Sequence, residues 1–156
     1  MEKRATSDAK RRKRSDKILD QIPNFIGEYL SHDLPSLFIY NYPISLIVKV
    51  EDSFLGICIS VDSVEVIDPL GFLRHLKCKN LKRFLEAHTC GKTFYVSPQI
   101  LEEGAKWPCF LFISIAFYLK FLIGISFQNY LELFHGNTSQ NRITLDRISN
   151  LVEKYS

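Results

Sequence analysis

The sequence lacks the cysteine spacing and the leader segment that mark disulfide-stapled, zinc-bound or secreted proteins. Its 156 residues contain only four cysteines, none in a Cys-x-x-Cys pair, and no signal peptide is recognisable at the start. We therefore expect reduced thiols, no disulfide framework, no metal site and no cofactor. We also expect the protein to reside in the nucleus or the cytoplasm rather than outside the cell.

The chain has little net charge, +3 overall, and its excess of basic residues lies at the beginning. Residues 1–20 hold eight Lys or Arg against four Asp or Glu, which leaves −1 for the remainder. We expect residues 1–17 to form a basic, flexible tail, helical only toward Lys17–Gln21, and residues 18–156 to form a single domain.

Within that tail, a continuous basic run is typical of a nuclear-import signal or of an arm that binds phosphate groups. A solubilising terminus is the alternative interpretation. If the arm binds nucleic acid through residues 3–17, its affinity should fall steeply with salt. The run consists of Lys10, Arg11, Arg12, Lys13 and Arg14.

Hydrophobic residues make up 46% of the chain, with 12 Phe and 7 Tyr, which argues for a globular protein and against disorder. Branched and aromatic residues, and apolar residues at helical spacing, predict the regular elements. The stretch from Ile18 to Gly27 is interpreted as a helix end running into a turn. Strands are predicted at 44–50, 54–61, 64–67 and 93–97, and helices at 72–88, 109–123, 127–134 and 143–152.

The most apolar segment runs from Cys109 to Ile123, where only Ser114 and Lys120 are polar, so a helix there should be buried on nearly all sides. A thiol at its first turn would feel the unpaired N–H groups and the positive end of the helix dipole, which favour the thiolate. Cys109 is therefore a candidate nucleophile. The alternatives are an inert core cysteine and, less favoured, a single membrane span over residues 109–125.

Several short motifs occur in a fixed order along the chain. They are Gly27 with Asp33-Leu34-Pro35, Tyr42-Pro43, Ile67-Asp68-Pro69-Leu70-Gly71, Leu101-Glu102 ahead of Cys109, and Gly124-Ile125-Ser126-Phe127. Their order and spacing resemble those of the adenovirus-type (adenain-like) cysteine proteases, which include proteases of virus-like DNA transposons and are distantly related to SUMO-specific proteases. The resemblance covers nearly all of residues 24–150.

The resemblance implies an α+β cysteine-protease fold, in which a small, mainly antiparallel sheet packs around a buried central helix that begins at Cys109. It also implies that Cys109 occupies the position of the nucleophile and Asp68 that of the carboxylate that orients a histidine. Active relatives bind DNA and use a peptide cofactor, so a protein or peptide partner is expected.

Four positions depart from the family pattern, and each departure opposes catalysis. Ser53 stands at the histidine position and Phe54 at the neighbouring tryptophan position. Without the imidazole, the thiol loses its activating partner and the leaving amine loses its proton donor. Glu102 replaces the glutamine of the oxyanion hole, and Phe110 replaces the glycine after the cysteine.

These departures predict a catalytically inactive pseudoprotease, viral or virus-derived, that serves as a binding or structural module. Nucleic acid could contact its basic tail. The alternative is an active cysteine endopeptidase in which Cys109 works with an unconventional base. The candidates for that base are His32, His75 and His88.

Overall fold

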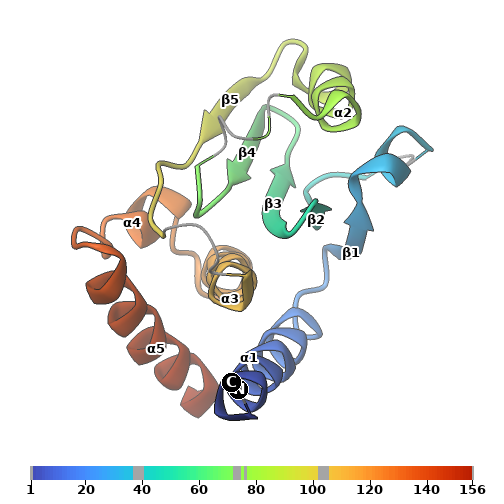
Figure 1. Cartoon of the computed structure of the whole chain (residues 1–156). Helices are drawn as coiled ribbons and strands as arrows, with labels where there is room; N and C mark the ends of the chain where they lie inside the picture. Colours follow the sequence, from blue (N-terminus) through green and yellow to red (C-terminus); the bar gives the residue numbers. More distant parts are fainter. Residues whose placement is uncertain (1, 37–40, 72–74, 76, 102–105, 156) are drawn as a thin grey trace. The chain divides into compact units, whose positions relative to one another are not determined.

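The computed structural model describes residues 2–36, 41–71, 75, 77–101 and 106–155 of the chain (Figure 1). It belongs to the α+β class, as the sequence predicted. The chain divides into two compact units, one formed by residues 1–23 and 100–156 and the other by residues 24–99. Each unit is described by itself below. The sequence predicted a boundary between residues 17 and 18, whereas residues on both sides of it belong to the same unit here.

The unit of residues 24–99 is built on a five-stranded sheet with strand order β1-β2-β3-β4-β5. The strands are β1 (Phe25–Leu30), β2 (Ile44–Val50), β3 (Ser53–Ile59), β4 (Ser63–Ile67) and β5 (Thr93–Val96). The central pairs β2·β3 and β3·β4 are antiparallel, whereas β1 and β5 each pair in parallel with their neighbour. The four strands predicted from the sequence are confirmed, with ends that differ by at most two residues.

Strand β1 was not predicted, because Pro23 and Gly27 looked like the end of a helix. The backbone instead turns after Pro23 and enters the sheet, where the Ser45 N–H donates to the Asn24 carbonyl at 2.9 Å. The register of β1 against β2 shifts between Phe25 and Glu28, and Gly27 has a φ of +133°. Such a bulge needs a residue without a side chain, so this glycine allows the strand rather than ending it.

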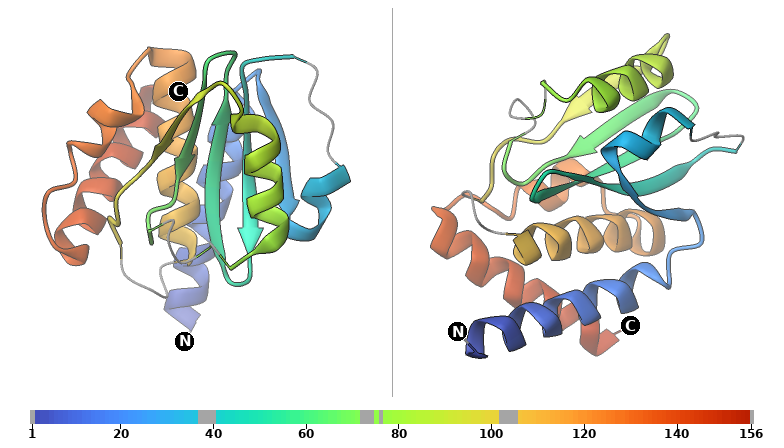
Figure 2. Two further views of the ribbon diagram at one scale, coloured as in Figure 1. Left: turned by 90° about the horizontal axis from the view of Figure 1, so that it is seen from above. Right: turned by 45° about the vertical axis from the view of Figure 1, so that its right-hand side comes forward.

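One face of the sheet is covered by helix α2 (Lys79–Thr89) and the 3-10 helix η1 (Ser31–Ser36) (Figure 2). Helix α2 contributes Leu81, Phe84 and Leu85, whose spacing places them on one helical face. The predicted helix 72–88 therefore begins later, at Lys79, although residues 72–74 and 76 lie outside the described part. The sheet contributes alternate residues to this core: Leu46, Val48, Leu55, Ile57, Val64 and Val66.

The other unit is helical. Its elements are α1 (Glu2–Leu19), α3 (Lys106–Tyr118), the π-helical turn η3 (Leu119–Ile123), α4 (Phe127–Leu131) and α5 (Thr138–Tyr155). Residues 108–118 of α3 are all buried, which confirms the predicted apolar helix up to that point. Beyond it, Leu122 and Ile123 are exposed in the π-helical turn, which ends at Gly124 with a left-handed φ of +88°.

Helix α1 differs from the expected loose tail, because its basic residues have specific partners in this unit. The Arg12 guanidinium lies 4.0 Å from the centre of the Phe110 ring in α3. The Arg14 Nε atom lies 3.2 Å from a carboxylate oxygen of Glu153 in α5. These partners are more than ninety residues away along the chain, so local composition gave no sign of them.

Among the described residues, no helix has both the length and the apolar character needed to cross a bilayer. The apolar segment 109–125 is divided among α3, the π-helical turn and the glycine that ends it.

Candidate functional site

The candidate site of the sheet unit is centred on Asp68, which follows the last residue of β4. Its side chain is fully buried. One carboxylate oxygen, Oδ1, accepts the Leu70 N–H at 3.0 Å, and the Gly71 N–H donates to the Asp68 carbonyl at 3.0 Å. The Asp68 N–H itself donates to the Ser97 hydroxyl at 2.8 Å. The predicted turn is thus real, and it fixes the carboxylate at the end of the strand.

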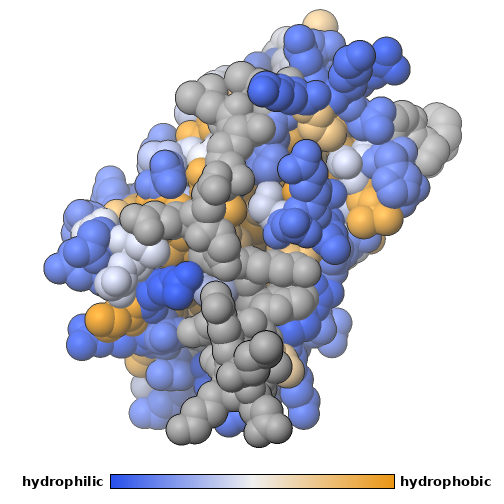
Figure 3. Space-filling model, in the orientation of Figure 1, coloured by the Kyte–Doolittle hydropathy of each residue, from blue (hydrophilic) through white to orange (hydrophobic). Residues whose placement is uncertain are grey.

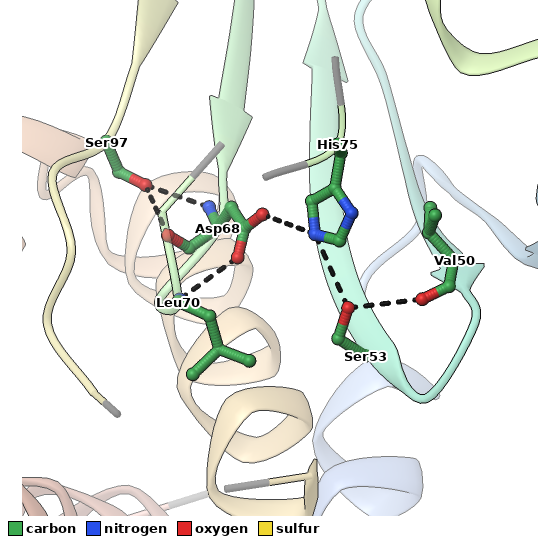
Figure 4. A network of polar contacts seen from close by, with 6 residues as sticks. All are labelled: Val50, Ser53, Asp68, Leu70, His75 and Ser97. Carbon is green, nitrogen blue, oxygen red and sulfur yellow. Dashed lines mark hydrogen bonds and ion pairs between the residues drawn. The ribbon is translucent and has the colours of Figure 1, made fainter. Parts of the chain in front are cut away.

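The second carboxylate oxygen of Asp68 faces His75 (Figure 4). The two atoms, Oδ2 and the ring nitrogen Nε2, are 2.8 Å apart, and both side chains are almost completely buried. The contact between Oδ2 and Nε2 is therefore a close polar contact and not an aligned hydrogen bond. A buried carboxylate needs such a neighbour, since an isolated buried charge is costly.

Ser53 completes the cluster from the first residue of β3. Its hydroxyl donates to the Val50 carbonyl at 3.1 Å and lies 3.4 Å from the same His75 nitrogen, Nε2. The serine hydroxyl therefore lies between the Val50 carbonyl and His75 Nε2, which is the same ring nitrogen that faces Asp68.

The shared nitrogen decides what the cluster can do. In a serine-hydrolase triad, one ring nitrogen faces the carboxylate and the other accepts the proton of the nucleophile. Here one nitrogen, Nε2, faces both Asp68 and Ser53, so the imidazole does not lie between the carboxylate and the hydroxyl as it does in a triad. Asp68, His75 and Ser53 have the residue types of a triad but not its geometry.

The structure brings an imidazole to Asp68, although not from the position that the family pattern uses. The resemblance places Ser53 at that position, whereas His75 reaches the carboxylate from seven residues after Asp68. Of the three histidines named from the sequence, His75 is the one that meets Asp68. His32 is exposed and lies 3.5 Å from Asp33, and the ring of His88 packs against Phe84 at 4.6 Å.

The sequence placed His75 in a predicted helix and named it, with His32 and His88, as a candidate base for Cys109, but it did not pair His75 with Asp68. One signal was available: a small residue, Ser53, at a position where the family has an imidazole, with a histidine shortly after the aspartate turn. A serine leaves room that a ring from a neighbouring loop can occupy.

The candidate nucleophile belongs to the helical unit. Cys109 is the fourth residue of α3, close to the predicted first turn, and its side chain has no exposed surface. The next residue, Phe110, is also buried, and its carbonyl accepts the Ser114 hydroxyl at 2.8 Å. Phe54, at the family's tryptophan position, is buried in β3. Glu102 lies outside the described residues.

The basic run is divided between two environments on α1. Lys10 and Lys13 are exposed, whereas Arg12 and Arg14 are half-buried and hold the partners described above. The side chain of Arg11 lies outside the described part. Within the residues that the structure describes, no three His, Cys, Asp or Glu side chains gather as metal ligands would.

Comparisons with known proteins add no family to this geometry. No protein-family model matches the sequence, and no curated protein is significantly similar to it.

Proposed function

We propose that the chain is a non-catalytic member of the adenain-like cysteine-protease fold, viral or virus-derived, that acts as a binding module. The cluster around Asp68 is the observation that carries this proposal. Its carboxylate, imidazole and hydroxyl are buried and turned toward one another, with one ring nitrogen facing the other two groups. Such a cluster ties the end of β4 to the start of β3 and does not place the imidazole between the carboxylate and a nucleophile.

The burial of Cys109 supports the same proposal. A nucleophilic thiol must reach the carbonyl carbon of its substrate, and this side chain has no exposed surface. The test is labelling of the native protein with a peptide vinyl sulfone at neutral pH, followed by mapping of the modified cysteine. Cys90, which is exposed, serves as the internal reference for ordinary thiol reactivity. Rapid labelling of Cys109, ahead of Cys90, would contradict the proposal.

The partner that the sheet unit fits best is an extended peptide added beside β5. This strand ends the sheet, and Phe94, Tyr95 and Val96 are each more than 40% exposed. The N–H groups of Thr93 and Ser97 point to β4, where they donate to the carbonyls of Asp62 and Val66. By alternation, the Val96 N–H points away from β4, toward an added strand.

This edge can be tested with a displayed library of short linear peptides. Peptides that bind should protect the Val96 amide from hydrogen exchange. Val96→Pro removes that donor while the ladder to β4 stays intact, so it should abolish peptide binding. Val96→Ala keeps the donor and is the matched control. Selection of no peptide, or equal binding by both variants, would refute the edge as the partner site.

Nucleic acid is a further partner, through the exposed lysines of α1. Lys10 and Lys13 are three residues apart on the helix and so lie on one face. If they contact phosphates, exchanging both for Gln should weaken binding to a DNA duplex and reduce the slope of log K against log salt by about 2. The control is to exchange Lys79 and Lys82 of α2, which are also exposed, for Gln, because this removes the same amount of positive charge from another helix. An unchanged salt slope in the α1 variant would rule this contact out.

A further inference from the structure

The sheet unit contains a cavity of about 360 Å³ beside helix α2, a feature with no role in the function proposed above. Leu81 and Leu85 of α2 form its apolar part, and Phe94 of β5 and Lys92 before it line the other side. His75 also lines this cavity. In the space-filling view, hydrophilic residues predominate over this part of the surface, with hydrophobic ones between them (Figure 3).

We propose that this cavity binds a small aromatic carboxylate. The volume is the first argument. An apolar protein cavity of about 150 Å³ holds benzene, so 360 Å³ admits a fused pair of rings with a polar head group. It lies within the range of about 300–1,000 Å³ that is usual for small-molecule sites.

The lining is the second argument, because it is apolar where a ring would sit. Leu81 and Leu85 are buried, and Phe94 is 41% exposed, so part of its ring is open to a ligand. A ligand ring against Phe94 would gain from aromatic packing as well as from removal of apolar surface from water. A purely polar ligand would leave this surface without a matching partner.

Charge is the third argument and selects the head group. Lys82 and Lys92 line the cavity together with one carboxylate, Glu86. Lys92 is held in place by the Ser60 carbonyl at 2.7 Å and the Tyr42 ring at 4.0 Å. It also acts on His88 of α2, whose pKa is lowered by burial first and by Lys92 second. The excess of positive charge favours an anionic group, and Lys82, which is exposed, is the cation able to meet it.

The site shares Phe94 with the peptide edge, but the rest of its lining lies outside β5 and does not include Cys109. It could therefore exist in a chain that binds no peptide, and its failure would leave the binding-module proposal in place.

The test is titration of the full chain with 2-naphthoate, followed by the backbone amide resonances of α2 and β5. We expect saturable shifts that centre on Leu85 and Phe94. The neutral analogue 2-naphthylmethanol should bind about fivefold more weakly, since an exposed ionic contact is worth up to about 1 kcal/mol. Lys82→Gln should lower the affinity for 2-naphthoate by a similar factor. Lys79→Gln, on the same helix but away from the cavity, should have no effect.

Two further variants test the location. Thr89→Trp places a large ring in the cavity from its rim and should abolish binding, and Phe94→Ala should weaken it without altering the core. The amide spectrum of each variant shows whether the fold is kept. The proposal is overturned if the wild-type chain shows no saturable shifts, or if the neutral analogue binds equally well. It is also overturned if folded Thr89→Trp, or Phe94→Ala, binds like the wild type.

Discussion

The Nε2 atom of His75 lies 2.8 Å from the Oδ2 atom of Asp68, in a place where neither side chain has appreciable contact with water. The pair links the end of β4 to a segment that follows the turn, and Ser53 adds the start of β3. We therefore expect the cluster to contribute mainly to the stability of the fold, which substitution of its residues can test.

Replacing Asp68 by Asn should destabilise the fold by about 2 kcal/mol, as expected for loss of a charged partner from a buried polar contact. The amide oxygen can still accept the Leu70 N–H, so the loss reports mainly on the contact with His75. Urea denaturation followed by circular dichroism measures the change. Asp52→Asn, in the exposed turn between β2 and β3, is the control and should change stability by less than about 0.5 kcal/mol. Equal effects of the two variants would show that the buried pair adds nothing.

Tyr130 should make stability fall at alkaline pH. Its hydroxyl donates to the Phe112 carbonyl at 3.1 Å inside the helical unit, and burial raises the pKa of Tyr130 well above its ordinary value of 10.0. Above pH 10.0 the unfolded chain loses this proton before the folded chain does, so the contribution present below that pH is lost as pH rises. Tyr130→Phe should cost about 1 kcal/mol at neutral pH.

The measurement is unfolding of both proteins from about pH 8 to about pH 11. The difference in unfolding free energy between wild type and Tyr130→Phe should shrink toward the alkaline end. A constant difference over this range would mean that Tyr130 does not titrate differently on unfolding.

The pKa of His88 should respond to Lys92. Burial is the larger cause that lowers this pKa from 6.5, and the charge of Lys92 is the second. Lys92→Gln should therefore raise the pKa of His88 but leave it below 6.5, as measured by NMR titration of the ring protons. Because the folded-state pKa is the lower one, the associated stability is present above pH 6.5 and is lost as pH falls toward the folded-state value. An unchanged pKa in the variant would remove Lys92 as a cause.

Arg14 and Lys13 are neighbours on α1 with different expected effects on stability. Arg14 contacts Glu153 at 3.2 Å and the Asn150 side chain at 3.4 Å, while Lys13 is exposed. Arg14→Gln should lower the free energy of unfolding by up to about 1 kcal/mol, and Lys13→Gln should leave it almost unchanged. The effect of Arg14→Gln should diminish at high salt, because the contact is partly exposed. Thermal unfolding at two salt concentrations measures both.

The parts of the fold that were predicted from the sequence are those set by local pattern. Strands β2, β3 and β4 follow from short runs rich in branched and aromatic residues, and α3 follows from a long apolar run. Strand β1 and helix α1 were missed because their stabilising partners are distant in sequence. The Asn24 carbonyl meets Ser45, and Arg14 meets Glu153, and neither pairing leaves a local trace.

In the candidate site, too, only the features set by local sequence were predicted. Asp68 could be placed because a strand followed by Asp-Pro-Leu-Gly fixes a turn, and Ser53 could be placed by its position in the hairpin. The pairing of His75 with Asp68 could not, because it depends on where a ring from the following segment comes to lie. The family resemblance itself stays a prediction.

The division of the chain has a consequence for its synthesis. Residues 24–99 form a compact unit from one continuous stretch, whereas the helical unit needs residues from both sides of that stretch. During synthesis, all five strands of the sheet leave the ribosome before α3 and α5. The sheet can therefore form its contacts before the partners of α1 have been synthesised. During that interval the apolar contacts of α1 are unmet, which makes this the stage at which a nascent chain would most need protection.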